Sequence, residues 1–199
     1  PNLVFVDNAA GIERIPLTAP HHHGDEPTDE ALHTDEDLLD PHVWLSPNNG
    51  KIIANNILNA LIEQEPGRAE EFQANYNYLI ADINDLDNQI ITILQDLDQR
   101  TFLVFHPAWG YFAEQYGLIQ VPVEVGGQEP SPTDMVNLVN IAREEQIRVI
   151  FVQPSFSTAN AIAIAKEIGA EVAVVDPLAR DWLQNLKVVA EAFAEAANQ

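Results

Sequence analysis

The sequence predicts an α/β fold in which a parallel sheet, flanked by helices, is joined to one long helix. Two patterns predict it. After Arg100, four strand-like segments alternate with helical segments, which is typical of a parallel sheet with helices on its faces. Before that point, an apolar seam runs through residues 68–100 with no Pro or Gly to interrupt it. A third feature, a segment rich in His and acidic residues at 18–39, points to function and not to fold.

The region up to residue 67 predicts a strand, a connection and a helix. Residues 3–6 are a short apolar run that reads as a strand inside a domain, so Pro1 is expected to be a processed or truncated start. Residues 48–65 predict a helix that Pro66-Gly67 ends. Its apolar positions recur at helical spacing: Ile52, Ile53, Ile57, Leu58, Leu61 and Ile62.

Residues 68–100 predict one helix of roughly 30 residues, close to 45 Å long at 1.5 Å per residue. A coiled-coil dimer is one interpretation of its seam. We favour a stiff strut across two lobes, because Ile80, Ile91 and Leu94 widen the apolar face beyond a two-stranded seam. The seam alternates steps of four and three: Phe72, Tyr76, Leu79, Ile83, Leu86, Ile90, Ile93 and Leu97.

The remainder of the chain predicts a four-stranded parallel sheet. Ligands of such sheets bind beyond the carboxyl ends of the strands, so the residues that follow each strand are candidates for function. The strands are expected at 101–105, 120–125, 148–152 and 171–175, and the helices at 108–116, 132–145, 158–168 and 181–197.

Composition limits the classes of partner. The formal net charge is −22, so long-range forces repel nucleic acid and anionic membranes and favour small cations. The chain has no cysteine, so any metal must be held by nitrogen and oxygen. No stretch approaches the roughly 20 apolar residues of a membrane span.

The acidic segment at 18–39 predicts a solvated loop that captures metal weakly. From His21 to Asp40 there are eight carboxylates and no Lys or Arg. Neutral imidazoles donate lone pairs to metals, and neighbouring carboxylates attract cations. The histidines concerned are His21, His22, His23 and His33. An acidic solubilising loop without a metal role is the alternative.

Three further residues predict a metal site. His106 directly follows the first strand of the sheet and Asp176 follows the fourth, so both lie at one sheet edge. His42 lies between Pro41 and Pro47 beside apolar anchors, which should hold it in place. Two imidazoles and a carboxylate suit Zn²⁺. Each residue alone is also compatible with a cap, a turn or a packing role.

Four motifs in order give the chain a resemblance to the zinc/manganese solute-binding proteins of bacterial ABC importers, cluster A-I. They are D-P-H-V-W-L-S-P at 40–47, F-H-P-A-W-G-Y-F at 105–112, E-P-S-P at 129–132 and D-P-L at 176–178. The resemblance implies two Rossmann-like lobes joined by one rigid helix. The lobes would be an incomplete N-terminal lobe at 1–67 and a C-terminal lobe at 101–199, with the helix at 68–100.

The resemblance also implies a site and a role. His42, His106 and Asp176 fall on the family's metal ligands, and His at 106 is typical of zinc members, whereas manganese members commonly have Glu. A further family ligand, an early histidine, has no counterpart here, so water or a loop histidine would replace it. The implied protein is monomeric and periplasmic or extracytoplasmic. It would capture Zn²⁺ between its lobes, more weakly at low pH, and deliver it to an ABC permease at the membrane.

Other functions remain open at this point. A manganese-binding protein or a cell-surface adhesin of the same family is one alternative. A zinc-dependent hydrolase is another, because three protein ligands and a water also make a catalytic zinc site. Glu129 is the candidate general base for such an enzyme, although no His-Glu-x-x-His pair is present. We favour binding without turnover.

Overall fold

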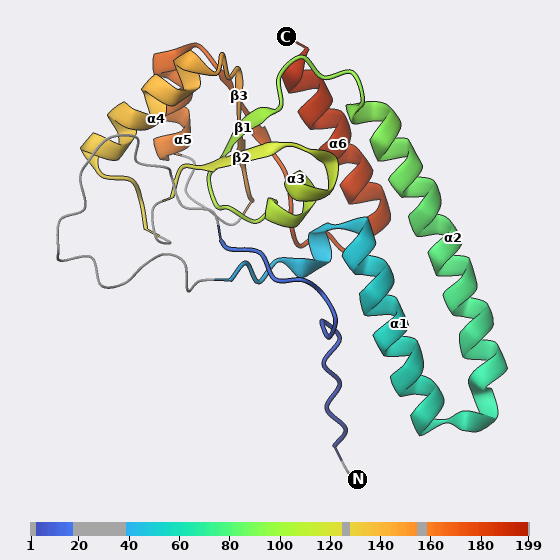
Figure 1. Ribbon diagram of the computed structural model, residues 1–199. Coiled ribbons are helices and arrows are strands. Elements are labelled where there is room, and N and C mark those ends of the chain that lie inside the picture. Colours follow the sequence, from blue (N-terminus) through green and yellow to red (C-terminus); the bar gives the residue numbers. More distant parts are fainter. Residues whose placement is uncertain (1–2, 18–38, 125–127, 155–158, 199) are drawn as a thin grey trace.

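A four-stranded parallel sheet forms the centre of the C-terminal half (Figure 1). The structure, a computed structural model, describes residues 3–17, 39–124, 128–154 and 159–198. The strand order is β2-β1-β3-β4, and every pairing is parallel, as predicted. The strands are β1 (Thr101–Val104), β2 (Ile119–Pro122), β3 (Val149–Val152) and β4 (Glu171–Val174).

Helices cover both faces of the sheet, because successive side chains of a strand point to opposite sides. Phe102 and Phe151 belong to one core cluster, whereas Leu103 and Ile150 belong to another. The first cluster is closed by α2, α3 and α6, and the second by α4 and α5. The helices after the first strand are α3 (Gly110–Tyr116), α4 (Pro132–Glu144), α5 (Ala159–Ile168) and α6 (Trp182–Ala197). All four were predicted.

The N-terminal part contributes an antiparallel helical hairpin that projects from the sheet (Figure 1). It consists of α1 (Pro47–Gln64) and α2 (Ala69–Leu94), joined by the short 3-10 helix η3 (Pro66–Arg68). The carboxyl half of α2 lies against α6. Apolar residues of this half are therefore buried within the same chain: the seam residues Ile83, Leu86 and Ile90, and Leu94 beside them. The role of the helix as a strut across two lobes stays a prediction.

The long helix ends earlier than predicted. It stops at Leu94, whereas the pattern predicted residue 100. The guanidinium of Arg100 donates to the carbonyl oxygens of Leu94 at 3.4 Å and Gln95 at 3.3 Å. Those carbonyls belong to the last turn and have no partner inside the helix, so the side chain replaces the next turn as a donor.

The predicted strand at residues 3–6 is wrong. These residues form neither helix nor strand, and the side chains of Leu3 and Phe5 are 82% and 91% exposed. A strand needs a neighbour for its backbone N–H and C=O groups, and in the described part of the chain no strand pairs with this segment.

A polar network ties the hairpin to α3. Asp87 of α2 pairs with Lys51 of α1 at 3.2 Å. Its other oxygen accepts hydrogen bonds from Gln115 and Tyr116, both at 2.8 Å. Burial, and then the hydrogen bond to Asp87, raise the pKa of Tyr116 above its usual value, so the hydroxyl stays protonated and keeps donating.

The described part of the chain contains no helix with the length and apolar character of a membrane span.

Candidate metal centre

His42 is held in place by a buried carboxylate. It precedes the 3-10 helix η2 (Val43–Leu45), and Asp40 Oδ1 accepts a hydrogen bond from its backbone N–H at 2.8 Å. The same oxygen lies 2.7 Å from His42 Nδ1. Asp40 is only 1% exposed. A Cβ atom at Gly110 would lie 2.5 Å from Asp40 Oδ2, so a glycine is needed there to admit the carboxylate.

His106 is held by a second buried carboxylate. It lies two residues beyond β1, and Glu124 lies two residues beyond the neighbouring strand β2. Glu124 Oε2 is 2.6 Å from His106 Nδ1, and Glu124 is 7% exposed. On the other side, Gln153 at the end of β3 donates to the His106 carbonyl at 2.9 Å. β2 lies on one side of β1, and β3 lies on the other side. The order of the strands therefore reverses at β1, and His106 lies at this switch point of the sheet.

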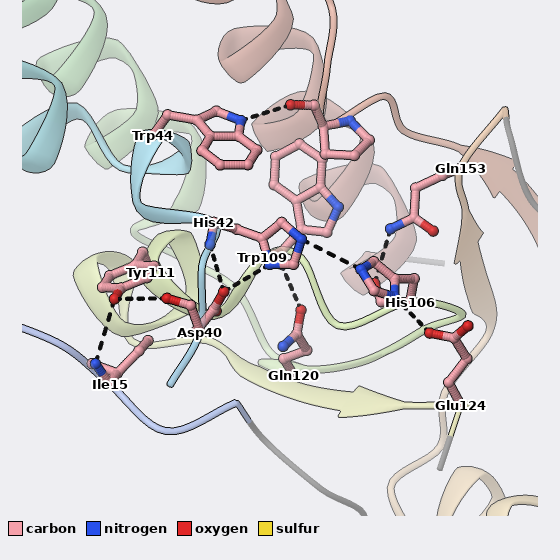
Figure 2. A network of polar contacts seen from close by, with 11 residues as sticks. Ile15, Asp40, His42, Trp44, His106, Trp109, Tyr111, Gln120, Glu124 and Gln153 are labelled. Atoms are coloured by element: carbon pink, nitrogen blue, oxygen red, sulfur yellow. Dashed lines mark hydrogen bonds and ion pairs between the residues drawn. The ribbon is translucent and has the colours of Figure 1, made fainter. Parts of the chain in front are cut away.

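The two imidazoles converge through their outer nitrogens. His42 Nε2 lies 3.3 Å from His106 Nε2 (Figure 2), and the two rings are nearly perpendicular, at 80°. A carboxylate only accepts hydrogen bonds, so each Nδ1 donates a hydrogen to its carboxylate, and in the neutral form of each imidazole Nε2 then presents a lone pair. In that form the two lone pairs face one another and repel unless a proton or a metal ion lies between them.

The separation fits a shared metal ion. Zn–N bonds are about 2.0 to 2.1 Å long, so two nitrogens of a tetrahedral zinc lie about 3.3 to 3.4 Å apart. The observed 3.3 Å between the Nε2 atoms of His42 and His106 agrees with this nitrogen–nitrogen distance. A carboxylate on Nδ1 is also the usual arrangement of zinc-binding histidines, because it sets the tautomer and makes the other nitrogen more basic.

The charge around the pair favours a divalent cation. Among the ion pairs of the described residues, Asp40 and Glu124 are each paired with an imidazole and with no Lys or Arg. With both imidazoles neutral, this leaves two buried negative charges uncompensated, which is costly in a protein interior. One divalent cation on the two Nε2 atoms would balance them.

In the part of the chain that the structure describes, the other predicted ligands are not brought together with the histidine pair. Asp176 follows β4, and its Oδ1 accepts a hydrogen bond from the N–H of Leu178 at 2.9 Å. Within the described ranges, no group of three His, Asp or Glu side chains is close enough to share a metal ion. Asp176 as the third ligand therefore stays a prediction. The suggested base Glu129 is exposed. The predicted loop ligands His21, His22, His23 and His33 lie outside the described residues.

The sequence patterns did not single out the two carboxylates that orient the ligands. Asp40 could have been suspected because it precedes His42 by two residues, a spacing at which an Asp side chain reaches the backbone ahead of it. Glu124 could have been suspected from its place after the strand next to β1. The strand order, which pairs β2 with β1, is not readable from the chain.

Comparison with known proteins gives consistent matches. Residues 2–196 match the family model described as the periplasmic component A of the zinc-uptake complex, ZnuA. The high-affinity zinc uptake system protein ZnuA of Bacillus subtilis (strain 168) is 33% identical over 177 residues. That match takes in 88% of this chain and 54% of the relative, so this chain spans about half of the relative's length.

Two solved structures share the fold. A crystal structure of ZnuA superposes with a TM-score of 0.84 at 39% identity, and the match covers 96% of this chain and 69% of that one. A zinc-bound crystal structure of a ZnuA deletion mutant gives 0.83 at 41% identity, and covers 96% and 68%. The manganese-type and adhesin alternatives are not favoured by these matches, and the family is one of solute-binding proteins, not enzymes. From its match over nearly the whole of its length, the chain belongs to the ZnuA family, the periplasmic component A of the zinc-uptake complex.

Proposed function

We propose that this chain binds Zn²⁺ as the solute-binding component of an ABC zinc importer and delivers it to the membrane permease on the extracytoplasmic side. The observation that carries the proposal is the pair of Nε2 atoms of His42 and His106, 3.3 Å apart. Each imidazole is oriented by its own buried carboxylate. Capture would need no rotation of either ring, so little ordering entropy would be lost on binding.

The donor atoms favour zinc over manganese. Imidazole nitrogen suits zinc and copper, whereas manganese prefers carboxylate, carbonyl and water oxygens. Zn²⁺ commonly takes four ligands in a tetrahedron. Asp176 is proposed as the third, with water or a further histidine as the fourth. The formal charge of −22 would attract the cation from a distance.

The histidines of the acidic segment are proposed as a weak secondary site. His21, His22, His23 and His33 would raise the local zinc concentration without forming the tight site. The segment can be removed cleanly, because Pro16 and Leu39 on either side of it form an antiparallel bridge. The N–H of Asp40 also donates to the carbonyl of Ile15 at 2.9 Å. A short glycine linker can therefore join the two ends without moving Asp40.

Removal of residues 18–38 tests the proposal. Zinc is titrated into the intact chain and the shortened chain against a chromophoric chelator, and bound zinc is counted per chain. We expect the shortened chain to keep one tight zinc with unchanged affinity and to lose the weaker ones. Loss of the tight zinc on shortening would put the primary site in the segment. Absence of tight zinc in the intact chain would refute the proposal.

The two carboxylates should tune zinc affinity without touching the metal. Asp40→Asn and Glu124→Gln keep an oxygen acceptor but remove the charge, so each should weaken zinc binding about 10- to 100-fold. The same chelator competition measures this. Asp7→Asn is the matched control, because Asp7 accepts a hydrogen bond from the backbone N–H of Ala9, two residues ahead, as Asp40 does from that of His42. Equal affinity in all three variants would contradict the assigned roles.

A further inference from the structure

We infer that Trp182 is a positioning residue for zinc binding, because two indole hydrogen bonds, from Trp182 to the Trp44 carbonyl and from Trp44 to the Pro177 carbonyl, tie the turn that carries Asp176 to the segment that carries His42. The inference rests on the proposed function. It concerns residues that do not touch the metal and act through the turn of residues 176–178.

The indole of each tryptophan donates a hydrogen bond to a backbone carbonyl near the other tryptophan. Trp44 Nε1 donates to the carbonyl oxygen of Pro177 at 2.9 Å, and Trp182 Nε1 donates to the carbonyl oxygen of Trp44 at 2.7 Å. Trp44 belongs to η2, and Trp182 is the first residue of α6. Segments that are more than 130 residues apart in the chain are thus joined by two hydrogen bonds in opposite directions. We call this pair the indole clamp.

The clamp connects the first histidine to the predicted third ligand. The Trp44 ring packs edge-on against the His42 ring, with centroids 5.5 Å apart. Its Nε1 reaches Pro177, the residue after Asp176 (Figure 2 shows this bond above His42). One rigid bicyclic ring therefore contacts a histidine of the pair and holds the backbone of the turn, which limits how far the turn can move from His42.

The turn itself is rigid on its other side. Asp176 Oδ1 accepts from the N–H of Leu178 at 2.9 Å, and the Asp176 carbonyl accepts from Asn185 Nδ2 of α6 at 2.7 Å. With Trp44 bound to Pro177, successive residues of the turn are tied to η2 and to α6. The clamp and α6 therefore hold the backbone of the turn, and the N–H of Leu178 holds one oxygen of the Asp176 side chain.

Gly50 makes room for the clamp. A Cβ atom at Gly50 in α1 would lie 2.6 Å from Cη2 of Trp182, closer than real side chains approach, so the indole lies directly on the helix backbone. Alanine there would displace the ring while improving the helix propensity of α1. Gly50→Ala should thus separate the position of the indole from the stability of the fold.

The test compares Trp182→Phe and Gly50→Ala with the unaltered chain. Phenylalanine keeps an aromatic ring but has no N–H donor. We expect both variants to bind zinc more weakly, by up to about 10-fold, because Trp182 lies one contact farther out than the direct partners of metal ligands, whose loss costs about 10- to 100-fold. With Co²⁺ in place of zinc, we expect the intense visible absorption of a four-coordinate ion to fall. The urea midpoint of Gly50→Ala, measured with chelator, should stay close to that of the unaltered chain, because the gain in helix propensity offsets part of the cost of the displaced ring.

Tyr116→Phe is the control. It removes a 2.8 Å hydrogen bond between elements, to Asp87, that does not involve the 176–178 turn, so zinc affinity and the cobalt spectrum should be unchanged. If His42→Ala loses zinc while Trp182→Phe and Gly50→Ala keep both readouts, the positioning role alone is wrong. If the unaltered chain holds no tight zinc, the proposed function fails and the positioning role fails with it.

Discussion

Replacement of His106 by alanine is expected to weaken zinc binding by about 100-fold or more. Structural zinc sites bind with about 10 to 16 kcal/mol from four ligands, so one ligand contributes about 2.5 to 4 kcal/mol. The variant also leaves Glu124, 7% exposed, without its imidazole, a cost that falls on the stability of the fold. Competition with a chromophoric chelator at neutral pH measures the change.

His42→Ala should have an effect of similar size, because it removes the other Nε2 of the pair and leaves Asp40 unpaired. His33→Ala is the matched control, since it removes an imidazole that is proposed to belong to the weak site. The tightest binding event should be the same in this control as in the unaltered chain. Equal affinity in all three variants would show that the convergent pair does not bind the metal.

Replacement of Phe193 by alanine is expected to lower the free energy of unfolding by about 3 to 5 kcal/mol, the usual cost of truncating a buried aromatic residue. Phe193 in α6 is 4% exposed. Its ring stacks on Phe102 of β1 and meets Phe151 of β3 edge-on, both with centroids 4.5 Å apart. Its ring centroid also lies 5.7 Å from that of Phe112 in α3 and 6.3 Å from that of Trp109, just before α3. Alanine would open a cavity between sheet, α3 and α6.

Urea unfolding followed by circular dichroism measures this change, with chelator present so that bound zinc does not add stability. Val188→Ala is the control, because Val188 lies on the same helix and is 47% exposed. It should change the free energy of unfolding by about 0.5 kcal/mol or less. A small loss for Phe193→Ala, comparable to that of the control, would mean that α6 does not close the core on this face of the sheet.

The aromatic core is connected to the candidate metal site through Trp109. Trp109 lies between them: its ring contacts Phe112 and Phe193 in the core, and its backbone N–H donates to Gln120 Oε1 of β2 at 2.8 Å. Trp109 is three residues after His106, so the loop that carries His106 is anchored in the packed aromatic cluster. A well-packed core therefore keeps the imidazole near its binding geometry before any metal arrives.

Much of the fold was predictable because its signals are local. The alternation of short apolar runs with amphipathic segments predicted the four strands and the four helices that follow them, with ends that agree to within a few residues. The unbroken seam of residues 68–100 predicted one long helix, which the structure has as α2 up to Leu94. Buried side chains on this seam repeat with the helical period, so they were readable without a partner.

Two predictions failed because the outcome depended on a distant partner. Residues 3–6 have the composition of a strand, yet they form none, because strand formation requires backbone partners that the described chain does not supply. The end of α2 was missed because Arg100 caps it from beyond the helix, through a side chain whose direction no periodicity encodes.

The residue order alone predicted which side chains could bind a metal. His106 and Asp176 were chosen because each directly follows a predicted parallel strand, and His42 because prolines and apolar residues hold it. The absence of cysteine and the charge of −22 predicted a cation bound by nitrogen and oxygen. These are properties of single positions and of composition.

The pairing of those side chains came from three-dimensional packing. The 3.3 Å approach of His42 to His106 across 64 positions, the buried partners Asp40 and Glu124, and the indole clamp all join segments that are distant in the chain or unremarkable in pattern. The physical reason is that hydrogen-bond direction and imidazole tautomer depend on atoms within about 3 Å, and strand order and helix packing, which no local pattern encodes, determine which atoms those are.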